Sequence, residues 1–511
     1  MICTSQPLAT AAGLRILQEG GNAVDAAVAA AAVLNVVEPM MTGIGGDLFA
    51  IIYWSKTDEL VGLNASGRSP YGMDLGYLQQ KGYSSMPVDG VDTITVPGAV
   101  DGWFSLIDRF GTLKMDRILA PAIEYAEKGF PVSEIIANEW AEQTAKLAKD
   151  PWAAETYLLG SKAPSHGQIV YSKNLAATMR RIAGGGRQTF YEGEIAGKIV
   201  EAIRNLGGVL GARDLADHKS EWVKPISVNY KGYDFHELPP NGQGITALEM
   251  LNLLEGYDLR AWGHNSADYL HHLVEAKKLA FADRDFYIAD PEFVRIPLDQ
   301  LLSKAYAAER RRLISPNRAR SEYEPGQSER SDTVYLTVVD KDRNAVSLIN
   351  SLFSQFGSGI VAGDTGICLQ SRGSSFKLDN VSSNRIEPHK RPMHTIIPAM
   401  VMRKGRPYFS FGVMGGDNQP QAQVQVFLNL VEFGMNVQEA GEAARFRHTD
   451  GQLGLESGIG PEVRRLLTLM GHRIVVMNDG FGGYQGIVID PGSGVLMGGS
   501  DPRKDGCAMG W

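Results

Sequence analysis

The sequence predicts a layered α/β fold, and two features of the chain carry this prediction. Helical patterns gather in the middle, between residues 120 and 286, whereas strand patterns separated by glycine turns fill the last third. Helices and sheets that are apolar on one face bury that face against each other, so such a chain packs in layers. With 511 residues, 44% hydrophobic and 21% charged, the chain has the composition of a globular protein with a large buried core.

The N-terminal hundred residues are rich in alanine and glycine and begin with two helical segments. We expect residues 8–18 to form a helix that stops at Gly20 and Gly21. Asn22 then caps a second helix, and Asp25 lies near the positive end of that helix. Because residues 26–32 contain nothing larger than valine, this second helix is expected to pack very closely on a neighbour.

A glycine-rich segment, residues 42–47 (TGIGGD), leads into an apolar strand over residues 48–53. Phosphate-binding loops open helices rather than strands. The pattern therefore predicts a plain tight turn at this point and no phosphate site.

The middle of the chain has apolar residues at helical spacing in four segments, namely residues 120–128, 175–182, 195–205 and 269–286. Pro121 is placed in the first turn of the first of these helices. The last one contains His271, His272 and Glu275, whose side chains are of metal-ligating types. Adjacent histidines point about 100° apart on a helix, so we expect a solvated or capping face here and no metal site.

The pattern changes to loops and strands in the C-terminal third. Residues 322–332 (EYEPGQSERSD) are charged and turn-forming, which predicts an exposed loop. A β-branched strand over residues 333–339 follows directly, and a turn at 340–344 leads to a second strand at 345–349. One helical stretch is expected near residues 421–433.

Composition excludes several classes of function. The 58 acidic and 50 basic residues give a net charge of −8, which argues against nucleic-acid binding. The cysteines, Cys3, Cys368 and Cys507, are odd in number and far apart, which excludes a disulfide framework and disfavours a cysteine zinc site. The most apolar stretch, residues 24–37, is too short to span a membrane, and no signal-peptide pattern precedes the fold. We therefore expect a cytoplasmic enzyme that acts on small molecules.

Common catalytic motifs are missing from the sequence, but one residue stands out. There is no GxSxG, GxxxxGK[ST], HExxH or clean GxGxxG motif, which disfavours hydride transfer, phosphoryl transfer and zinc proteolysis. Thr333 opens a strand directly after the expected loop. Its hydroxyl would need a base to act as a nucleophile, and cutting the Asp332–Thr333 bond would free an α-amine that can serve as that base. The pattern alone favours the plainer interpretation, a threonine that is only a strand former.

Several segments, in matching order along nearly the whole chain, resemble the γ-glutamyltranspeptidase family. They are residues 19–27 (EGGNAVDAA), 95–99 (TVPGA), 333–342 (TVYLTVVDKD), 356–361 (FGSGIV), 444–446 (ARF) and 500–503 (SDPR). The resemblance implies an N-terminal-nucleophile hydrolase with a four-layer αββα sandwich, made as one precursor that cleaves itself before the nucleophilic threonine. Residues 1–332 would form a large subunit and residues 333–511 a small subunit, and the two together would form one αββα unit.

The resemblance also implies a catalytic centre. Thr333 matches the family's nucleophile and new N-terminus, and Ser351 stands where the family has a threonine that hydrogen-bonds the nucleophile. Gly415 and Gly416 match the glycine pair whose backbone N–H groups form the oxyanion hole. Glycines suit this role because the donors must approach the oxyanion to about 3 Å.

The residues that match the family's amino-acid clamp differ from the usual ones. Ser66 stands where transpeptidases hold the γ-glutamyl group with an arginine, and Arg68 follows two residues later. The other tentative substrate-binding positions are Phe353 in place of an asparagine, Arg372 in place of a glutamine, Ser375 in place of an aspartate, and His394 and Thr395 in place of two serines. Loss of the aspartate matters most, because a buried substrate ammonium without its partner is costly.

These observations predict a γ-glutamyltranspeptidase-like amidohydrolase or acyltransferase that works through an acyl-enzyme on Thr333 without a cofactor or metal. An acylase for glutaryl-type amides, similar to the cephalosporin acylases, is the alternative in the same class. An unprocessed family member that acts as a binding or structural protein is the alternative in another class. The predicted partners are a small amide substrate and the two fragments of one precursor, with neither nucleic acid nor membrane; whether these fragments form a homodimer is left open.

Overall fold

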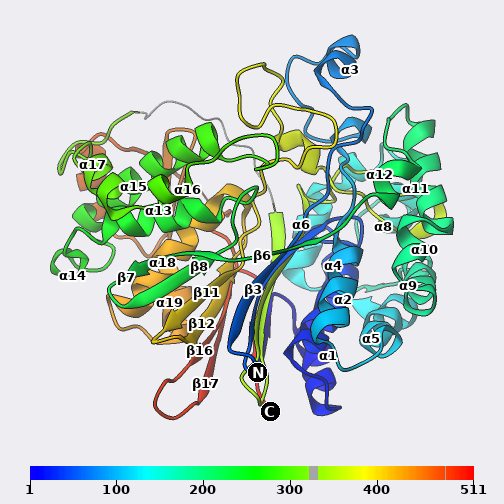
Figure 1. Ribbon diagram of the computed structural model, residues 1–511, viewed down its shortest axis with the longest axis horizontal. Coiled ribbons are helices and arrows are strands. Elements are labelled where there is room, and N and C mark those ends of the chain that lie inside the picture. The colour runs from blue at the N-terminus through cyan, green and yellow to red at the C-terminus, as the bar shows by residue number, and fades with distance from the viewer. Residues whose placement is uncertain (322–331, 478) are drawn as a thin grey trace.

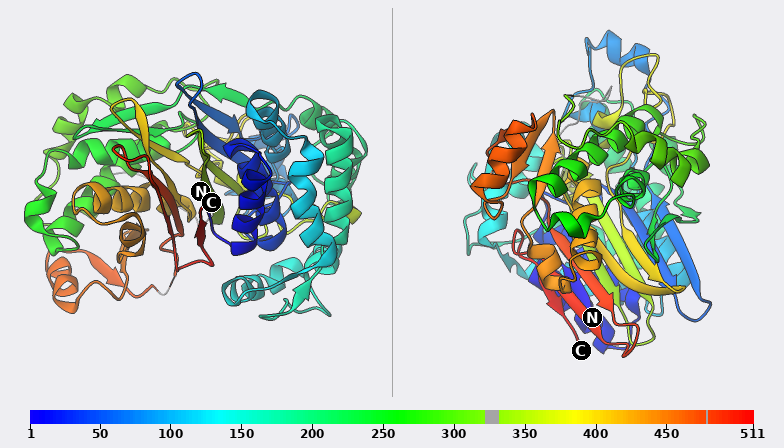
Figure 2. Two further views of the ribbon diagram at one scale, coloured as in Figure 1. Left: turned by 90° about the horizontal axis from the view of Figure 1, so that it is seen from below. Right: turned by 90° about the vertical axis from the view of Figure 1, so that its left-hand side faces the viewer.

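Two β-sheets packed face to face form the centre of the protein, and helices cover the outer face of each sheet (Figure 1). The computed structural model describes residues 1–321, 332–477 and 479–511. Viewed from below, the layers follow one another as helices, sheet, sheet and helices (Figure 2). The αββα sandwich implied by the resemblance is therefore confirmed. The expected loop at residues 322–332 lies, except for its last residue, outside the described residues.

Both central sheets are antiparallel throughout. The seven-stranded sheet has the order β18 (Cys507–Met509), β1 (Ile2–Thr4), β9 (Asp332–Val339), β10 (Ala345–Phe353), β2 (Asp47–Trp54), β3 (Glu59–Ala65) and β6 (Glu221–Val223). The six-stranded sheet has the order β17 (Leu496–Ser500), β16 (Tyr484–Ile489), β12 (Arg406–Val413), β11 (Ala399–Arg403), β8 (Tyr233–Glu237) and β7 (Ile226–Tyr230). Smaller sheets join β13 (Phe446–Thr449), β14 (Gln452–Leu455) and β15 (Arg473–Val475), and β4 (Phe130–Pro131) with β5 (Ile169–Val170).

The helices divide between the two outer layers (Figure 1). Those on the side of the seven-stranded sheet are α1 (Pro7–Gln18), α2 (Ala23–Val37), α4 (Ala99–Phe110), α5 (Met115–Lys128), α6 (Glu134–Glu142), α7 (Thr144–Leu147), α8 (Pro151–Tyr157), α9 (Lys173–Gly185), α10 (Arg187–Tyr191), α11 (Glu194–Asn205) and α12 (Ala212–Ala216). Those on the side of the six-stranded sheet are α13 (Gly244–Leu254), α14 (Leu259–Trp262), α15 (Ala267–Tyr287), α16 (Leu298–Leu301), α17 (Lys304–Arg311), α18 (Gln419–Val431), α19 (Val437–Glu442) and α20 (Pro461–Leu469). The short α3 (Leu75–Gln80) projects at the top of Figure 1.

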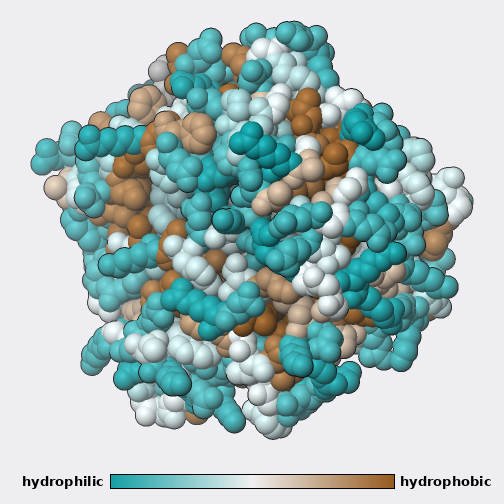
Figure 3. Space-filling model, turned by 45° about the vertical axis from the view of Figure 1, so that its right-hand side comes forward, coloured by the Kyte–Doolittle hydropathy of each residue, from teal (hydrophilic) through white to brown (hydrophobic). Residues whose placement is uncertain are grey.

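Strand β9 contributes side chains to two different layers of the hydrophobic core. Val334, Leu336 and Val338 contribute to the core between the seven-stranded sheet and its helices. Tyr335 and Val339 contribute to the core between the two sheets. Successive side chains of a strand point to opposite faces, and both faces of β9 are covered, so its sequence after Thr333 is apolar except for Thr337, whose hydroxyl is hydrogen-bonded to Ser410 Oγ. The face of the molecule that Figure 3 shows is mostly hydrophilic, with apolar residues in separate groups.

The N-terminal helices form as the sequence predicts. The side chain of Asn22 accepts the N–H groups of Val24 and Asp25, and Asp25 completes the capping box. Helices α1 and α2 pack so closely that a Cβ on Gly13 would lie 2.2 Å from Ile2 Cδ1 and 3.1 Å from the Ala26 carbonyl oxygen. Helix α2 is buried along its whole length, and among the described residues no helix has the length and hydropathy that a membrane crossing requires.

Two predicted boundaries are wrong. Helix α5 begins at Met115, which places Pro121 in the helix interior rather than in its first turn. The burial of Ile118 and Leu119 against the apolar core supports the turns before the proline despite the hydrogen bond that it cannot donate. Strand β10 continues to Phe353 instead of ending near residue 349, because pairing with β2 and β9 covers its whole length.

The end of β8 carries a carboxyl group that has no hydrogen-bond partner among the residues that the structure describes. Glu237 is fully buried, and burial holds its pKa well above the usual value. As the pH rises above about 4.5, an unfolded chain ionises this group while the folded protein keeps it protonated, so the folded state loses relative stability. We expect Glu237→Leu to raise the free energy of unfolding by about 1–3 kcal/mol. Denaturant titration should show a larger gain at pH 7 than at pH 4, and equal gains would contradict this explanation.

Candidate active site

Thr333 lies near the start of β9, in the centre of the molecule, and its side chain is 1% exposed. Its hydroxyl donates a hydrogen bond to Ser351 Oγ on the adjacent strand β10, with an Oγ–Oγ distance of 3.2 Å. Gln419, the first residue of α18, places its Nε2 3.5 Å from Thr333 Oγ. Two of the predicted catalytic residues are therefore in direct contact.

A β-bulge positions Ser351. The register of β10 against β9 shifts between Asn350 and Phe353, so the strand bends at this point. The Phe353 N–H donates to Ser351 Oγ at 2.9 Å, and Phe353 itself adopts a left-handed φ of +81°. Bulky residues rarely adopt this conformation, and such conformations cluster at functional sites.

Arg372 connects Ser351 to a second predicted residue, Thr395. Its guanidinium is fully buried and donates to Ser351 Oγ at 3.2 Å and to Thr395 Oγ1 at 2.7 Å. Burial lowers the pKa of Arg372 to about 9, while the charges of Asp47 and Asp417 oppose that shift. Its Nε has no partner, and Arg372 forms no ion pair with a carboxylate of the described residues. A cationic guanidinium next to the nucleophile thus lacks a direct counter-ion.

The ring of Phe353 lies over this guanidinium, with Arg372 Cζ 4.3 Å from the ring centroid. The sequence predicted Phe353 only as a tentative substrate-binding position. The structure instead stacks the ring on the cation, an arrangement that stabilises a buried guanidinium.

The glycine-rich turn at residues 42–47 brings Asp47 to the same region. Gly46 donates its N–H to the Gly43 carbonyl at 3.0 Å, which confirms the predicted turn. A Cβ on Gly46 would lie 2.2 Å from the carbonyl oxygen of Ser351, so glycine allows the two backbones to touch. The turn therefore helps to fix the strand that carries Ser351.

Asp47 is fully buried and is the hydrogen-bond acceptor of four groups. They are the backbone N–H groups of Gly67 and Gly98, Gln370 Nε2, and His394 Nε2 at 3.0 Å. Burial alone would raise the pKa of Asp47, but its bond to His394 and the charge of Arg372 leave that pKa below the usual value. The carboxylate ties four separate segments together behind the site.

His394 has both ring nitrogens in use. Its Nε2 faces Asp47, and its Nδ1 accepts the N–H of Ile396 at 3.3 Å. Burial lowers the pKa of His394 to about 4, with a further contribution from Arg372, so the ring is neutral near pH 7. The structure gives His394 a framework role and leaves it no ring nitrogen for the substrate contact that the sequence predicted.

Gly415 and Gly416 form a turn between β12 and α18. Their φ angles are +118° and +56°, which glycine adopts without the strain that a Cβ would cause. Three residues further on, Gln419 reaches Thr333 Oγ, so the turn lies at the nucleophile's end of α18. The position and backbone suit the predicted oxyanion donors.

The other two predicted substrate residues lie outside this chain of contacts. Arg68 binds the carboxylates of Asp290 at 3.1 Å, Glu292 at 2.8 Å and Glu221 at 3.5 Å. Its charge is already compensated there, unlike that of Arg372. The Ser375 hydroxyl donates to the carbonyl oxygens of Arg372 and Met393, which fixes the short turn that carries Arg372.

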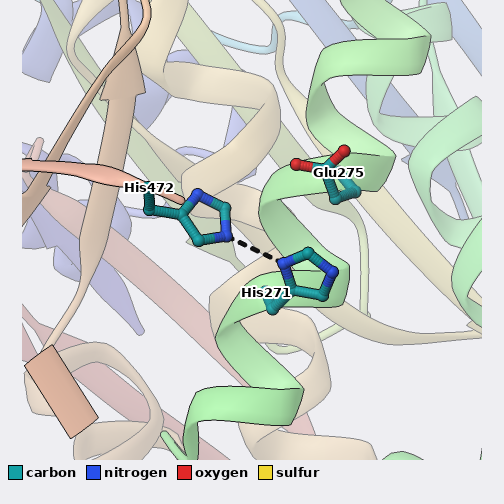
Figure 4. A group of neighbouring side chains, drawn as sticks. All are labelled: His271, Glu275 and His472. Carbon is teal, nitrogen blue, oxygen red and sulfur yellow. Dashed lines mark hydrogen bonds between the residues drawn. The ribbon is translucent and has the colours of Figure 1, made fainter. Parts of the chain in front are cut away.

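The prediction of a solvated face around His271, His272 and Glu275 is wrong, because all three side chains are buried. His271 Nδ1 lies 2.8 Å from His472 Nε2, with Glu275 nearby on the same helix (Figure 4). Glu275 binds the ammonium of Lys278 at 2.6 Å. The chain after α20 brings His472 over this part of α15, which helical spacing alone could not indicate.

His271, Glu275 and His472 place possible ligand atoms within 4.8 Å of one another. The carboxylate is already neutralised by Lys278, and the two imidazoles are bonded to each other. A divalent cation would add uncompensated charge beside a buried ammonium, so this donor set does not fit a metal. We assign it a packing role.

Sequence reasoning missed four residues that hold the site, namely Asp47, Gln243, Arg284 and Gln419. The sequence pattern places Asp47 only at the end of a turn, and Gln419 lies just before the helix expected near residues 421–433. Gln243 belongs to residues 239–244 (PPNGQG), whose two prolines and two glycines signal a rigid turn next to a helix. That turn was the available signal for Gln243; nothing in the sequence indicates Arg284.

Comparisons with known proteins agree with this geometry. A model of the gamma-glutamyltranspeptidase family matches residues 9–511. The glutathione hydrolase-like YwrD proenzyme of Bacillus subtilis is 41% identical, and the alignment covers all of this chain and 98% of the relative. The acylase ACY 1 proenzyme of Pseudomonas sp. (strain V22) is 36% identical over 99% of this chain and 92% of its own length. The crystal structure of cephalosporin acylase from Bacillus halodurans superimposes with a TM-score of 0.95 at 41% identity, covering 100% of this chain and 95% of that one.

Proposed function

Since the chain belongs to the γ-glutamyltranspeptidase family, we propose that it cleaves itself at Asp332–Thr333 and then hydrolyses amides whose acyl group ends in a carboxylate and has no α-amine. The observation that carries the choice of substrate is Arg372. Its buried guanidinium has no direct counter-ion among the described residues and lies one hydrogen-bonded residue from Thr333. A substrate carboxylate would supply the missing charge.

In the proposed reaction, Thr333 Oγ attacks the amide carbon while the freed α-amine of the same residue takes the hydroxyl proton. The N–H groups of Gly415 and Gly416 hold the developing oxyanion, and Ser351 orients the hydroxyl. The amide C–N bond then breaks, and the amine passes its proton to the leaving nitrogen. Water, or a second amine, attacks the acyl-enzyme and restores the threonine.

The missing ammonium partner supports the choice of acyl group. Where a γ-glutamyl donor needs an anion for its α-ammonium, the chain has Ser375, and the hydroxyl of Ser375 donates to two backbone carbonyls. The acylases that the chain resembles are consistent with this proposal. A glutaryl chain has the same length as a γ-glutamyl chain but carries no ammonium.

The test compares two chromogenic donors, glutaryl and γ-glutamyl p-nitroanilide, under identical conditions with the purified protein. We expect a higher kcat/KM for the glutaryl compound. A preference of tenfold or more for the γ-glutamyl donor, about 1.4 kcal/mol in transition-state binding, would overturn the proposed substrate class. Denaturing gel electrophoresis of the same sample should show two fragments.

A further inference from the structure

Gln243 joins two parts of the candidate site by hydrogen bonds. One part is the segment of Thr395, which Arg372 contacts, and the other is the turn of Gly415 and Gly416. Its side chain is fully buried in the turn between β8 and α13. The Nε2 group donates to the carbonyl oxygens of Thr395 at 2.8 Å and of Gly416 at 2.9 Å. One amide group thus connects the residue that Arg372 contacts with the glycine turn.

Arg284, on α15, fixes the orientation of that amide. Its Nη1 donates to Gln243 Oε1 at 2.9 Å and to Asp417 Oδ1 at 2.5 Å, and its side chain is 2% exposed. Because the arginine has only donors, the Gln243 oxygen must face it and the NH₂ group must face the two carbonyls. Asp417 directly follows Gly416, so Arg284 holds the glycine turn both directly and through Gln243.

From these contacts we infer that Gln243 is a positioning residue for the oxyanion turn and that Arg284 holds it in place. The inference rests on the proposed function. Oxyanion donors are effective because they are oriented before the reaction begins. Gly415 and Gly416 have the most permissive backbone of any residue, so their peptide groups need an external contact to keep one orientation. Gln243 supplies such a contact at the Gly416 carbonyl, which belongs to the peptide group directly after the one that carries the Gly416 N–H, so it restrains the backbone on that side of the donor.

These hydrogen bonds also connect the two predicted fragments. Gln243 and Arg284 belong to residues 1–332, whereas Thr395 and Gly416 belong to residues 333–511. The small fragment would therefore supply the nucleophile and the oxyanion donors, and the large fragment would hold those donors in position.

The experiment compares Gln243→Met, Gln243→Glu and Arg284→Met with a matched control, Gln425→Met. Gln425 is also a buried glutamine, six residues along α18 from Gln419, and its side chain is hydrogen-bonded to the backbone N–H and C=O of Phe446. For each variant, kcat and KM are measured with the better p-nitroanilide, together with the melting temperature. Amide hydrogen exchange of the peptide covering residues 414–418 reports the turn itself.

For Gln243→Met we expect kcat to fall about tenfold or more with KM within twofold of wild type, since losing one oxyanion donor outright costs on the order of 10²–10³. Gln243→Glu, which turns an acceptor oxygen toward the two carbonyls, should fall further. Arg284→Met should change kcat in the same direction. Exchange at residues 414–418 should accelerate in all three variants, whereas Gln425→Met should lower the melting temperature and leave both kcat and this exchange unchanged.

An unchanged kcat in Gln243→Met, or an equal loss in Gln425→Met, would overturn the inference. If wild type hydrolyses neither donor, the proposed function is wrong. In that case the amide hydrogen exchange of residues 414–418 still tests whether Gln243 holds the turn. Equal exchange rates in wild type and Gln243→Met would contradict this role of Gln243.

Discussion

The Thr333→Ala variant is expected to remain one chain of 511 residues and to have no measurable amidase activity. The same hydroxyl is proposed to attack first the preceding peptide carbonyl and later the substrate, so its removal stops both reactions. Loss of a catalytic nucleophile can lower kcat on the order of 10⁶-fold. Because Thr333 Oγ contacts, among the described residues, Ser351 at 3.2 Å and Gln419 at 3.5 Å, its loss should disturb the fold little.

Gel electrophoresis and intact-mass measurement distinguish the outcomes. Wild type should give fragments that begin at Met1 and Thr333, and Thr333→Ser should give the same fragments because it keeps the hydroxyl. Cleavage of Thr333→Ala at the same bond, or wild type that stays uncut after long incubation, would contradict the assignment of the nucleophile.

Replacement of Arg372 by glutamine is expected to lower kcat/KM for a glutaryl anilide about ten- to a hundredfold. A hydrogen bond to a charged group in a closed site contributes about 1.5–3 kcal/mol. The variant also removes a contact with Ser351, which affects every substrate. A butyryl anilide, which has no terminal carboxylate, measures that general effect, so the ratio of the two rates isolates the carboxylate contact.

Arg68→Gln provides a contrast to Arg372→Gln, because Arg68 already binds three carboxylates and should affect the glutaryl-to-butyryl ratio much less. The pH dependence gives a second measure. With a pKa of about 9, Arg372 loses its charge as the pH rises through that value. KM for the glutaryl anilide should therefore rise above about pH 9 while that for the butyryl anilide does not. A larger effect of Arg68→Gln than of Arg372→Gln would show that Arg68, and not Arg372, binds the substrate carboxylate.

The local elements of the fold could be predicted because their signals are local. Asn22 and Asp25 form the expected capping box, and the β-branched run after Thr333 forms β9. The αββα arrangement needed the resemblance, since no periodicity indicates that β1, at one end of the chain, pairs with β18, at the other.

Within the site, the contact between Thr333 and Ser351 follows from two adjacent strands, and the resemblance placed both residues there. The other contacts of the candidate site join segments that are distant in the sequence. Asp47 meets His394 across 347 positions of sequence, and Gln243 meets Gly416 across 173. The burial of His271 was misjudged for the same reason, because the segment that covers it lies 201 residues away.

Both central sheets draw strands from either side of Thr333, and β1 lies between β9 and β18. Neither fragment could complete a sheet alone, so the precursor is the unit that folds. While the chain is continuous, its own length keeps the two parts at a high effective concentration, and folding is a first-order process. The proposed cut before Thr333 would make any later refolding a second-order encounter of two incomplete chains. Recovery of the native structure after unfolding would then depend on protein concentration for the cleaved enzyme and not for the Thr333→Ala precursor. Once cleaved and unfolded, the protein would therefore fail to refold at high dilution.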